Sequence, residues 1–216
     1  MDVTELTPVA QDYLKVIWSA TEWGDPPITT TGLAKRFHTT TANVSVTLRR
    51  LEGQGLVTYQ PYRPATLTRL GHRLAVAMVR RHRLLEAFLA SELGYAWDEV
   101  HAEAERLEHA VSEDLLERID RRLGHPRIDP HGDPIPAADG SLLLSPTTMS
   151  LLSAPSGRYQ VTRVSDAEDA VLAALAAVQV TPGTHVDWRA DRSELAVNGA
   201  VVEASESMLA AIRILP

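Results

Sequence analysis

The chain of 216 residues predicts a mainly α-helical protein that ends in a small β-rich domain. Up to residue 124, apolar side chains recur every three or four positions, which is the spacing of one helix face. From Gly157 onward, short segments alternate apolar and polar residues, which is the spacing of half-buried strands. A stretch rich in proline, glycine, serine and threonine separates the two patterns and is typical of turns and linkers.

The first helix is expected to begin at Thr7, whose hydroxyl can cap it, and Pro8, which suits the first helical turn. A short helix follows in TTTGLAKRF, and a third begins near Thr39 and ends at Gly53. The segment LVTYQPYRPATLT alternates on both sides of a Tyr62-Arg63-Pro64 tip, as a short hairpin does. Helices followed by a hairpin predict a winged helix-turn-helix whose third helix is the reading element.

Charge is distributed unevenly along the chain. The total is −7, yet residues 28 to 83 contain ten lysines and arginines and the single acid Glu52, a net charge of +9 that leaves −16 for the rest. A basic module on an acidic body is typical of a protein that docks on phosphate through one face. We therefore interpret the winged helix as a module that binds double-stranded DNA.

The third helix begins with small hydroxyl and amide side chains, which suit close approach to base edges and thymine methyl groups. The residues expected near the bases are Thr40, Thr41, Ala42, Asn43 and Thr47. The residues expected at phosphates are Lys35, Arg49, Arg50 and Arg63. An alternative stays open, in which Thr40, Thr41 and Asn43 only cap the helix.

Three further helices are predicted. A long one runs from about Arg69 to Leu93, the next starts near Trp97, and SEDLLERIDRRL forms a third from Ser112 to Gly124. They carry more apolar side chains than one compact monomer needs, so we expect a helical dimer interface. Its candidate residues are Leu84, Leu85, Phe88, Leu89, Val111, Leu115 and Leu116.

Imidazoles and carboxylates recur at helical spacing in this central region. His82 and Glu86 are four residues apart, and a second set has intervals of four, three and one: His101, Glu105, Glu108 and His109. Each set falls on one helix face, and Asp12 points the same way as the buried face of the first helix. Such groups suit a borderline or hard divalent cation. The absence of cysteine excludes disulfides and thiolate ligands, so the pattern predicts a metal site built from nitrogen and oxygen.

Two other interpretations of this cluster stay open. The histidines and acids could form surface ion pairs with Arg80, Arg81, Arg83 and Arg106. They could also belong to a helical metalloenzyme or metal-storage protein with a carboxylate-bridged metal pair. That arrangement repeats Glu-x-x-His on two helices, whereas the sequence has one such unit, so we expect no enzyme.

The carboxy-terminal region changes character. Residues 125 to 140 are dense in proline and glycine, and residues 141 to 156 are expected to form a mobile linker. Strands are predicted in RYQVTRV, THVDWRA, ELAVNG and AAIRIL, with one helix around VLAALAAV, and together they predict a small β-barrel. The sequence lacks both an apolar run of roughly 18 residues and a secretory signal, so we expect a cytoplasmic protein without a membrane partner.

Four segments carry a resemblance to a known family: QDYLKVIW, RRHRLLEAFL, DEVHAEAERLEHAVS and DPHGDPIP. With the winged helix and the final barrel, they make the chain similar to the diphtheria toxin repressor family, and within it to the manganese-responsive MntR branch. The resemblance implies a homodimeric repressor that binds palindromic operator DNA when its metal is bound, and a carboxy-terminal SH3-like (FeoA-like) domain. The implied domains are 1–72 for DNA binding, 73–140 for dimerisation and metal binding, a 141–156 linker, and 157–216 for the SH3-like domain.

The resemblance also implies the metal ligands. The primary site would use Asp12, Glu105, Glu108 and His109, and a neighbouring site would use His82, Glu86 and His101. The SH3-like domain would add Asp166 and Asp169, although both could simply be acids at a helix N-terminus. His125 and His131 are interpreted as turn or packing residues.

The resemblance bears on the choice of metal as well. In the iron-responsive branch, methionine and cysteine stand at the positions of Asp12 and Glu105, so two carboxylates shift the preference toward Mn(II). Fe(II) or Co(II) are expected substitutes. The sequence therefore predicts a manganese-dependent repressor of metal-uptake genes, with an iron-dependent repressor as the alternative.

Overall fold

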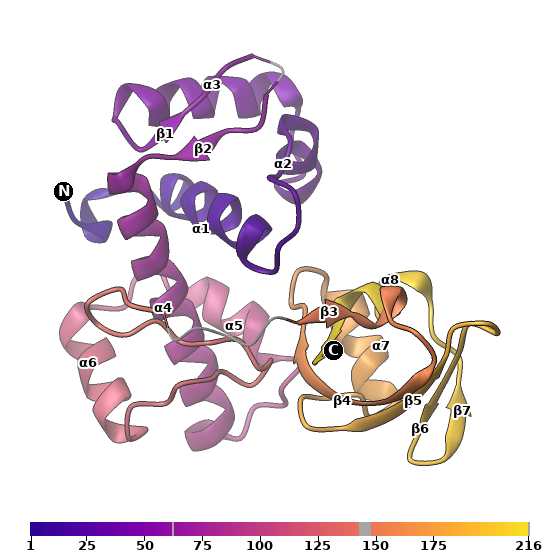
Figure 1. The fold of residues 1–216 in the computed structure, drawn as a ribbon. Coiled ribbons are helices and arrows are strands. Elements are labelled where there is room, and N and C mark those ends of the chain that lie inside the picture. Colours follow the sequence, from indigo (N-terminus) through magenta and orange to yellow (C-terminus); the bar gives the residue numbers. More distant parts are fainter. Residues whose placement is uncertain (62, 143–147, 216) are drawn as a thin grey trace. The chain divides into compact units, whose positions relative to one another are not determined.

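The computed structural model of the chain describes residues 1–61, 63–142 and 148–215. They divide into two compact units (Figure 1). The first consists of Met1–Arg81 with Pro136–Ser141, and the second consists of His82–Ile135 with Leu142–Pro216. Helix α4 (Arg69–Leu93) contributes its first half to one unit and its second half to the other.

The first unit contains the predicted winged helix-turn-helix. Its elements are η1 (Val3–Glu5), α1 (Pro8–Glu22), α2 (Thr30–Arg36), α3 (Thr41–Gly53) and the antiparallel strands β1 (Val57–Thr58) and β2 (Thr66–Leu67). Thr7, Thr29 and Thr40 cap α1, α2 and α3, because each hydroxyl accepts a backbone N–H three residues ahead. The helices enclose fully buried leucines, among them Leu14, Leu33 and Leu48. Tyr62, at the predicted hairpin tip, lies outside the described residues.

The second unit begins with the helical part that carries the predicted ligands. The second half of α4 packs with α5 (Val100–Leu107) and α6 (Glu113–Arg122) around Leu84, Leu89 and Val100. Ser112 caps α6 by accepting the N–H of Leu115. These helices agree with the sequence-based prediction, except that α5 begins three residues after Trp97.

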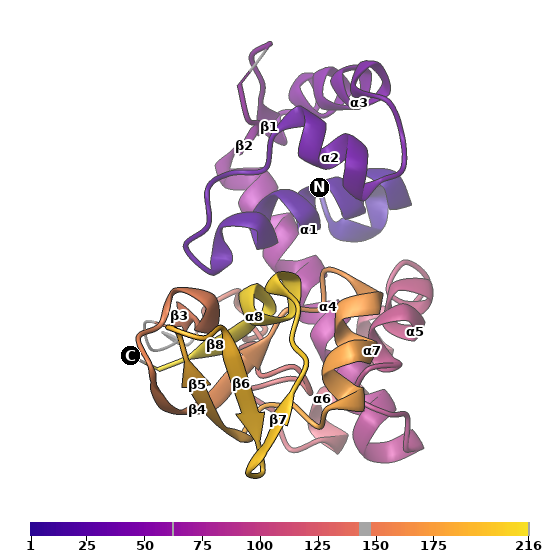
Figure 2. The same cartoon turned by 90° about the vertical axis from the view of Figure 1, so that its right-hand side faces the viewer.

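The rest of the second unit is an antiparallel sheet of six strands in the order β3-β8-β4-β5-β6-β7. The strands are β3 (Met149–Ser150), β4 (Gly157–Val164), β5 (His185–Arg189), β6 (Glu194–Val197), β7 (Ala200–Val202) and β8 (Ile212–Ile214). Helix α7 (Asp169–Ala177) packs on the strands through Leu172 and Leu175 (Figure 2). Among the described residues the edge strands β3 and β7 do not pair with each other, so the sheet is open where a closed barrel was predicted.

Three short elements differ from the prediction. The expected mobile linker instead contains β3 and η2 (Leu151–Ser153), because Leu151 is fully buried in the sheet core. The predicted strand AAIRIL begins as the end of helix α8 (Glu206–Ala211), and only Ile212–Ile214 is extended. ELAVNG contains a hairpin turn, since Asn198 and Gly199 both have positive φ, 52° and 81°, between β6 and β7.

In the described part of the chain, helices lack the length and apolar character needed to cross a membrane.

Candidate metal centre and nucleic-acid interface

The predicted ligands His82, Glu86 and His101 meet in the interior of the second unit. His82 and Glu86 lie one turn apart on α4 and face His101 on α5, and all three are buried. His82 Nε2 lies 2.9 Å from Glu86 Oε1 and 3.1 Å from His101 Nδ1, and that nitrogen lies 3.2 Å from Glu86 Oε1. Helical spacing therefore identified three side chains whose donor atoms converge on one point.

Asp166 joins this group from the segment that follows β4. Its Oδ2 lies 3.1 Å from His101 Nδ1 and 4.0 Å from His82 Nε2. With Glu86 they form a set of four potential ligands whose donor atoms all lie within 4.8 Å of one another. Asp169 is an exposed residue in the first turn of α7 and is not in this set, so its placement agrees with the alternative interpretation as a helix N-terminal acid.

A second group of potential ligands shares Glu86 and adds Asp129 and His131 from the DPHGDPIP segment. His131 is fully buried, with Nδ1 3.6 Å from Glu86 Oε1, and Nε2 lies 2.8 Å from the carbonyl oxygen of Trp97. If Nε2 donates to that carbonyl, Nδ1 is directed at the ligand cluster. His131 was predicted to be a turn or packing residue, but the structure places it in a group of potential ligands with Glu86 and Asp129. The Asp-x-His spacing in this segment was the available signal. His125, by contrast, is exposed beside Asp120.

The negative charges of the buried carboxylates in these groups are balanced by protons on the neighbouring imidazoles. Burial alone would lower the pKa of His101, but the carboxylates of Asp166, Glu105 and Glu86 together outweigh burial and raise that pKa to about 12. Burial likewise opposes charge on Glu86, yet the imidazoles of His82, His101 and His131 together hold the pKa of Glu86 well below its usual range. Burial raises the pKa of Asp129, and the carboxylates of Asp133 and Glu86 add to that effect. Imidazolium protons thus stabilise buried carboxylates that a divalent cation would also stabilise.

Three buried polar atoms bear on whether the two ligand groups suit a cation. Within the described residues, Glu86 Oε2, Asp129 Oδ2 and His131 Nδ1 have no hydrogen-bond partner. Buried polar atoms are normally satisfied, and these three belong to one ligand group. The donor set of imidazole nitrogens and carboxylate oxygens therefore fits a divalent metal ion.

The other predicted ligands lie at the end of α5 and on α1. Glu108 is fully buried, with Oε2 2.6 Å from His82 Nδ1 and Oε1 3.7 Å from His109 Nε2. Glu105 is 44% exposed and its Oε1 lies 3.5 Å from His101 Nε2. Asp12 is half-buried on α1 of the first unit. A primary metal site shared by Asp12, Glu105, Glu108 and His109 stays a prediction.

Most of the predicted DNA-contacting residues are exposed, including Thr40 and Asn43, and Thr40 also caps α3. Lys35, Arg49, Arg50 and Arg63 are exposed, as are Thr41 and Ala42, whereas Thr47 is half-buried. Thr40 Oγ1 accepts the N–H of Asn43, so Thr40 does cap α3, whereas the side chain of Asn43 donates from Nδ2 to the Thr39 hydroxyl. Val46, which was not predicted as a contact, is 64% exposed at the centre of α3.

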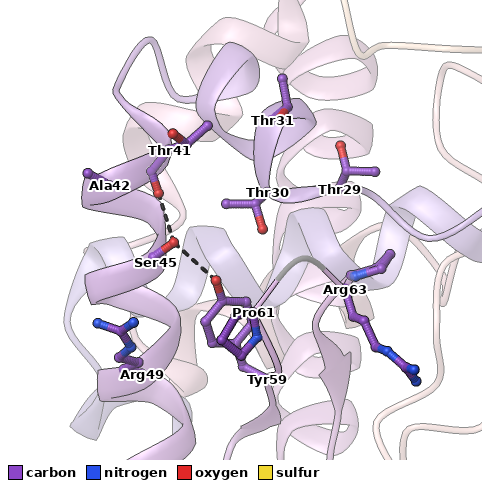
Figure 3. A pocket seen from close by; sticks show the side chains of 11 residues that line it. Thr29, Thr30, Thr31, Thr41, Ala42, Ser45, Arg49, Tyr59, Pro61 and Arg63 are labelled. Carbon is purple, nitrogen blue, oxygen red and sulfur yellow. Dashed lines mark hydrogen bonds between the residues drawn. The ribbon is translucent and has the colours of Figure 1, made fainter.

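A hollow of about 560 Å³ lies between the start of α2, the start of α3 and the wing (Figure 3). Thr30, Ser45 and Tyr59 direct hydroxyls into it, and Arg49 and Arg63 lie at its sides. Ser45 Oγ donates to the Thr41 carbonyl at 2.9 Å, so the Tyr59 hydroxyl, 3.0 Å away, donates to Ser45. Sequence analysis missed Thr30, Ser45 and Tyr59, because only the fold brings α2 and the wing beside α3.

Glu52, the single acid among residues 28 to 83, also forms a hydrogen bond to the wing. Its Oε1 accepts the backbone N–H of Tyr59 at 3.0 Å. Together with the Ser45 contact, this bond ties the wing to α3 through both the backbone and the side chain of Tyr59.

The predicted dimer interface is only partly available on the surface. Leu84, Leu85, Leu89, Val111 and Leu116 belong to the core of the second unit, so the prediction is wrong for these five side chains. Leu115 is 48% exposed and Leu107, which was not predicted, is 39% exposed. The burial of the four leucines follows from packing among α4, α5 and α6, which the apolar spacing alone did not distinguish from packing between subunits.

Comparison with known proteins agrees with these features. Residues 5–65 match the family "Iron dependent repressor, N-terminal DNA binding domain", and residues 68–137 match "Iron dependent repressor, metal binding and dimerisation domain". The chain is 39% identical over 134 residues to the iron-dependent repressor IdeR of Mycobacterium tuberculosis, a match that spans 62% of this chain and 58% of IdeR.

Two solved structures are similar over nearly the whole chain. A manganese-dependent transcriptional repressor in complex with manganese is 44% identical, with a TM-score of 0.87 and coverage of 95% of this chain and 99% of that chain. The manganese regulator SloR is 29% identical, with a TM-score of 0.81 and coverage of 97% and 99%. Both families matched are domains of repressors and not of enzymes, as predicted. The chain therefore belongs to the diphtheria toxin repressor (DtxR/IdeR) family of metal-dependent transcriptional repressors.

Proposed function

We propose that this protein is a manganese-dependent repressor that binds palindromic operator DNA as a homodimer and represses metal-uptake genes. The observation that carries the proposal is the buried convergence of Glu86 with two imidazoles, Asp166 and the Asp129–His131 segment. A repressor described as manganese-dependent is 44% identical to this chain, which supports the choice of metal.

The ligand chemistry also favours manganese. Every candidate ligand offers nitrogen or oxygen, and the chain has no cysteine. Mn(II) binds such ligands weakly and gains from hard anionic oxygens, which Glu86, Asp129 and Asp166 supply. In this proposal, Asp12 and Glu105 add two more carboxylates at the primary site.

The metal would act by neutralising carboxylates, and the side chains would do the positioning. His82 has a central place, because Nε2 faces the ligand group while Nδ1 contacts Glu108. If His82 helped to hold the metal through Nε2, its proton would stay on Nδ1, from which it would be donated to Glu108 and would orient that carboxylate. The two predicted sites would thus support each other.

Coupling to DNA follows from the predicted primary site. Asp12 belongs to the winged-helix unit, and Glu105, Glu108 and His109 belong to the unit with the metal centre. A metal ion held by both would restrict the orientation of the two reading helices in a dimer, whose spacing must match the turns of DNA. Metal would then raise DNA affinity and, by linkage, DNA would raise metal affinity.

An iron-dependent repressor is the second candidate, favoured by the 39% identity to IdeR and by the iron-dependent description of the matched families. The two differ in metal preference. The double variant Asp12→Met with Glu105→Cys replaces hard ligands by soft ones, so activation of DNA binding should move from Mn(II) toward Fe(II) or Co(II). A variant that keeps the preference of the unmodified protein would contradict the ligand argument.

The test of the function uses duplex DNA selected from a random pool with Mn(II) present. Gel-shift titrations of the full chain should show tight binding with Mn(II) and weak binding with a chelator. Glu103→Gln on α5, whose partner is the exposed Arg106, serves as a control and should bind like the unmodified protein. Equal affinity with Mn(II) and with chelator would refute the proposal.

A further inference from the structure

The ligands Asp129 and His131 sit on one tight turn. Asp129 Oδ1 accepts the backbone N–H groups of His131 and Asp133, both at 2.9 Å, and the Asp129 N–H donates to the Asp133 carbonyl at 3.0 Å. These bonds occupy Oδ1 of Asp129, a residue of the second ligand group, and leave Oδ2 without a hydrogen bond among the described residues. The conformation of the turn therefore decides where both ligands point.

Strand β4 holds this turn from outside the helical part. The Val164 N–H donates to the His131 carbonyl at 2.9 Å. Gly132, with φ of +87°, approaches the strand so closely that a Cβ there would lie 2.1 Å from the Thr162 carbonyl oxygen. Only glycine fits this contact, because it combines a left-handed conformation with the absence of a side chain.

Arg163 on β4 holds the same turn through an ion pair with Asp133. Arg163 Nε donates to Asp133 Oδ1 at 2.5 Å, and its Nη2 pairs with the same oxygen. From α4, Arg83 approaches Asp129 Oδ2 at 3.5 Å and Asp133 Oδ2 at 3.6 Å, and it donates to the Pro134 carbonyl at 2.8 Å. Arg163, Asp133, Asp129 and Arg83 are all buried. A buried pair of this kind fixes geometry strongly, because losing one partner leaves the other charge buried.

Given the metal binding proposed above, we infer that Arg163 is a positioning residue for the metal centre. Through Asp133 it holds the turn that presents Asp129 and His131 to Glu86. The strand that bears Arg163 also leads directly to Asp166, so both ligand groups around Glu86 depend on β4 lying against the turn. The carboxy-terminal sheet thus shapes the centre beyond the one ligand it contributes.

The test measures Mn(II) binding to the full chain by calorimetry. Arg163→Met keeps the length and apolar stem of the side chain and removes its charge, and Arg163→Lys keeps the charge but not the two-pronged contact. Arg158→Met, at an exposed arginine on the same strand, is the matched control. Loss of a group that orients ligands lowers metal affinity by about 10- to 100-fold, so we expect that loss in Arg163→Met, a smaller one in Arg163→Lys and none in Arg158→Met.

Circular dichroism and melting in chelator separate positioning from folding. The expected result is a metal-free Arg163→Lys variant that melts cooperatively and still binds Mn(II) less tightly than the Arg158→Met control. Unchanged Mn(II) affinity in Arg163→Lys and Arg163→Met would overturn the inference. If Arg163→Met does not fold, the Mn(II) affinity of Arg163→Lys alone decides whether the inference holds.

Glycine variants test the close contact independently. Gly132→Ala and Gly183→Ala both place alanine at positive φ, +87° and +92°, but the added Cβ at Gly183 has no neighbour within 4 Å. Gly132→Ala should weaken Mn(II) binding more than Gly183→Ala, and equal effects would overturn the role of the contact with β4. Absence of Mn(II) binding in the unmodified protein would instead reject the proposed function itself, and the inference with it.

Discussion

The winged helix and the metal centre both gather charged side chains, but the winged helix leaves them in solvent and the metal centre buries them. Lys35, Arg49, Arg50 and Arg63 are exposed, whereas Glu86, His101 and Asp129 are almost fully enclosed. Exposed charges need no partner within the protein and are screened by salt. Buried charges need a partner at every site. The comparison teaches that the exposed charges of the winged helix are free to meet an external polyanion, whereas the buried charges of the metal centre are balanced within the protein by imidazoles and arginines.

The largest effect is expected from a substitution in the buried metal centre. Glu86 belongs to both ligand groups, so Glu86→Gln removes a shared anionic ligand. We expect Mn(II) affinity, measured by calorimetry, to fall by more than about 100-fold, since even supporting groups around a metal are worth 10- to 100-fold. Mn(II)-dependent gel shifts should disappear with it.

The control is Glu92→Gln on the same helix, where the carboxylate pairs with Arg122 near the surface. This variant should bind Mn(II) like the unmodified protein, because an exposed ion pair contributes little. A Glu86→Gln protein with normal Mn(II) affinity would show that the buried group is structural, and the contrast between the two regions would fail.

An intermediate effect is expected from a substitution among the exposed arginines of the winged helix. Arg50→Ala should weaken binding to all DNA sequences alike and reduce the slope of log affinity against log salt by about one unit, because one phosphate contact is lost. Its Mn(II) affinity without DNA should not change. Gel shifts at several salt concentrations give the slope, with the exposed Arg192→Ala of the second unit as the control. An unchanged slope would remove Arg50 from the phosphate contacts.

The smallest effect concerns the link between the wing and α3. Tyr59→Phe removes the hydroxyl that donates to Ser45, a bond worth about 1 kcal/mol, so DNA affinity should fall by less than about fivefold. Tyr95→Phe, at a 40% exposed tyrosine of the second unit, should leave DNA affinity unchanged. A loss much larger than fivefold in Tyr59→Phe would mean that the hydroxyl contacts DNA directly.

Sequence patterns located the helical ligands because helix geometry converts spacing into direction. His82 and Glu86 are four residues apart and therefore share a face, which holds in the structure. The same patterns could not place His131, because the direction of a side chain on an irregular turn depends on contacts such as that between Gly132 and β4. Family resemblance supplied Asp166, which the spacing of residues alone would have left as a helix N-terminal acid.

Sequence patterns also failed to predict the short elements, for a related reason. Strand β3 has two residues and helix α8 has six, so neither carries a full period of apolar spacing. Their conformations follow from burial of Leu151 and Leu209 against the sheet, which is a tertiary effect. The misassigned dimer residues have the same origin, since Leu84 and Leu116 look alike in sequence whether they pack within a subunit or between two.

The charge imbalance of the basic stretch has a kinetic consequence. The only carboxylate among residues 28 to 83, that of Glu52, accepts the amide N–H of Tyr59, which fixes its position but leaves its charge. Because ten lysines and arginines outnumber this one acid, an approaching polyanion meets an attractive field from this stretch. Long-range attraction of this kind speeds diffusional encounter and permits sliding along a duplex before a target sequence is found.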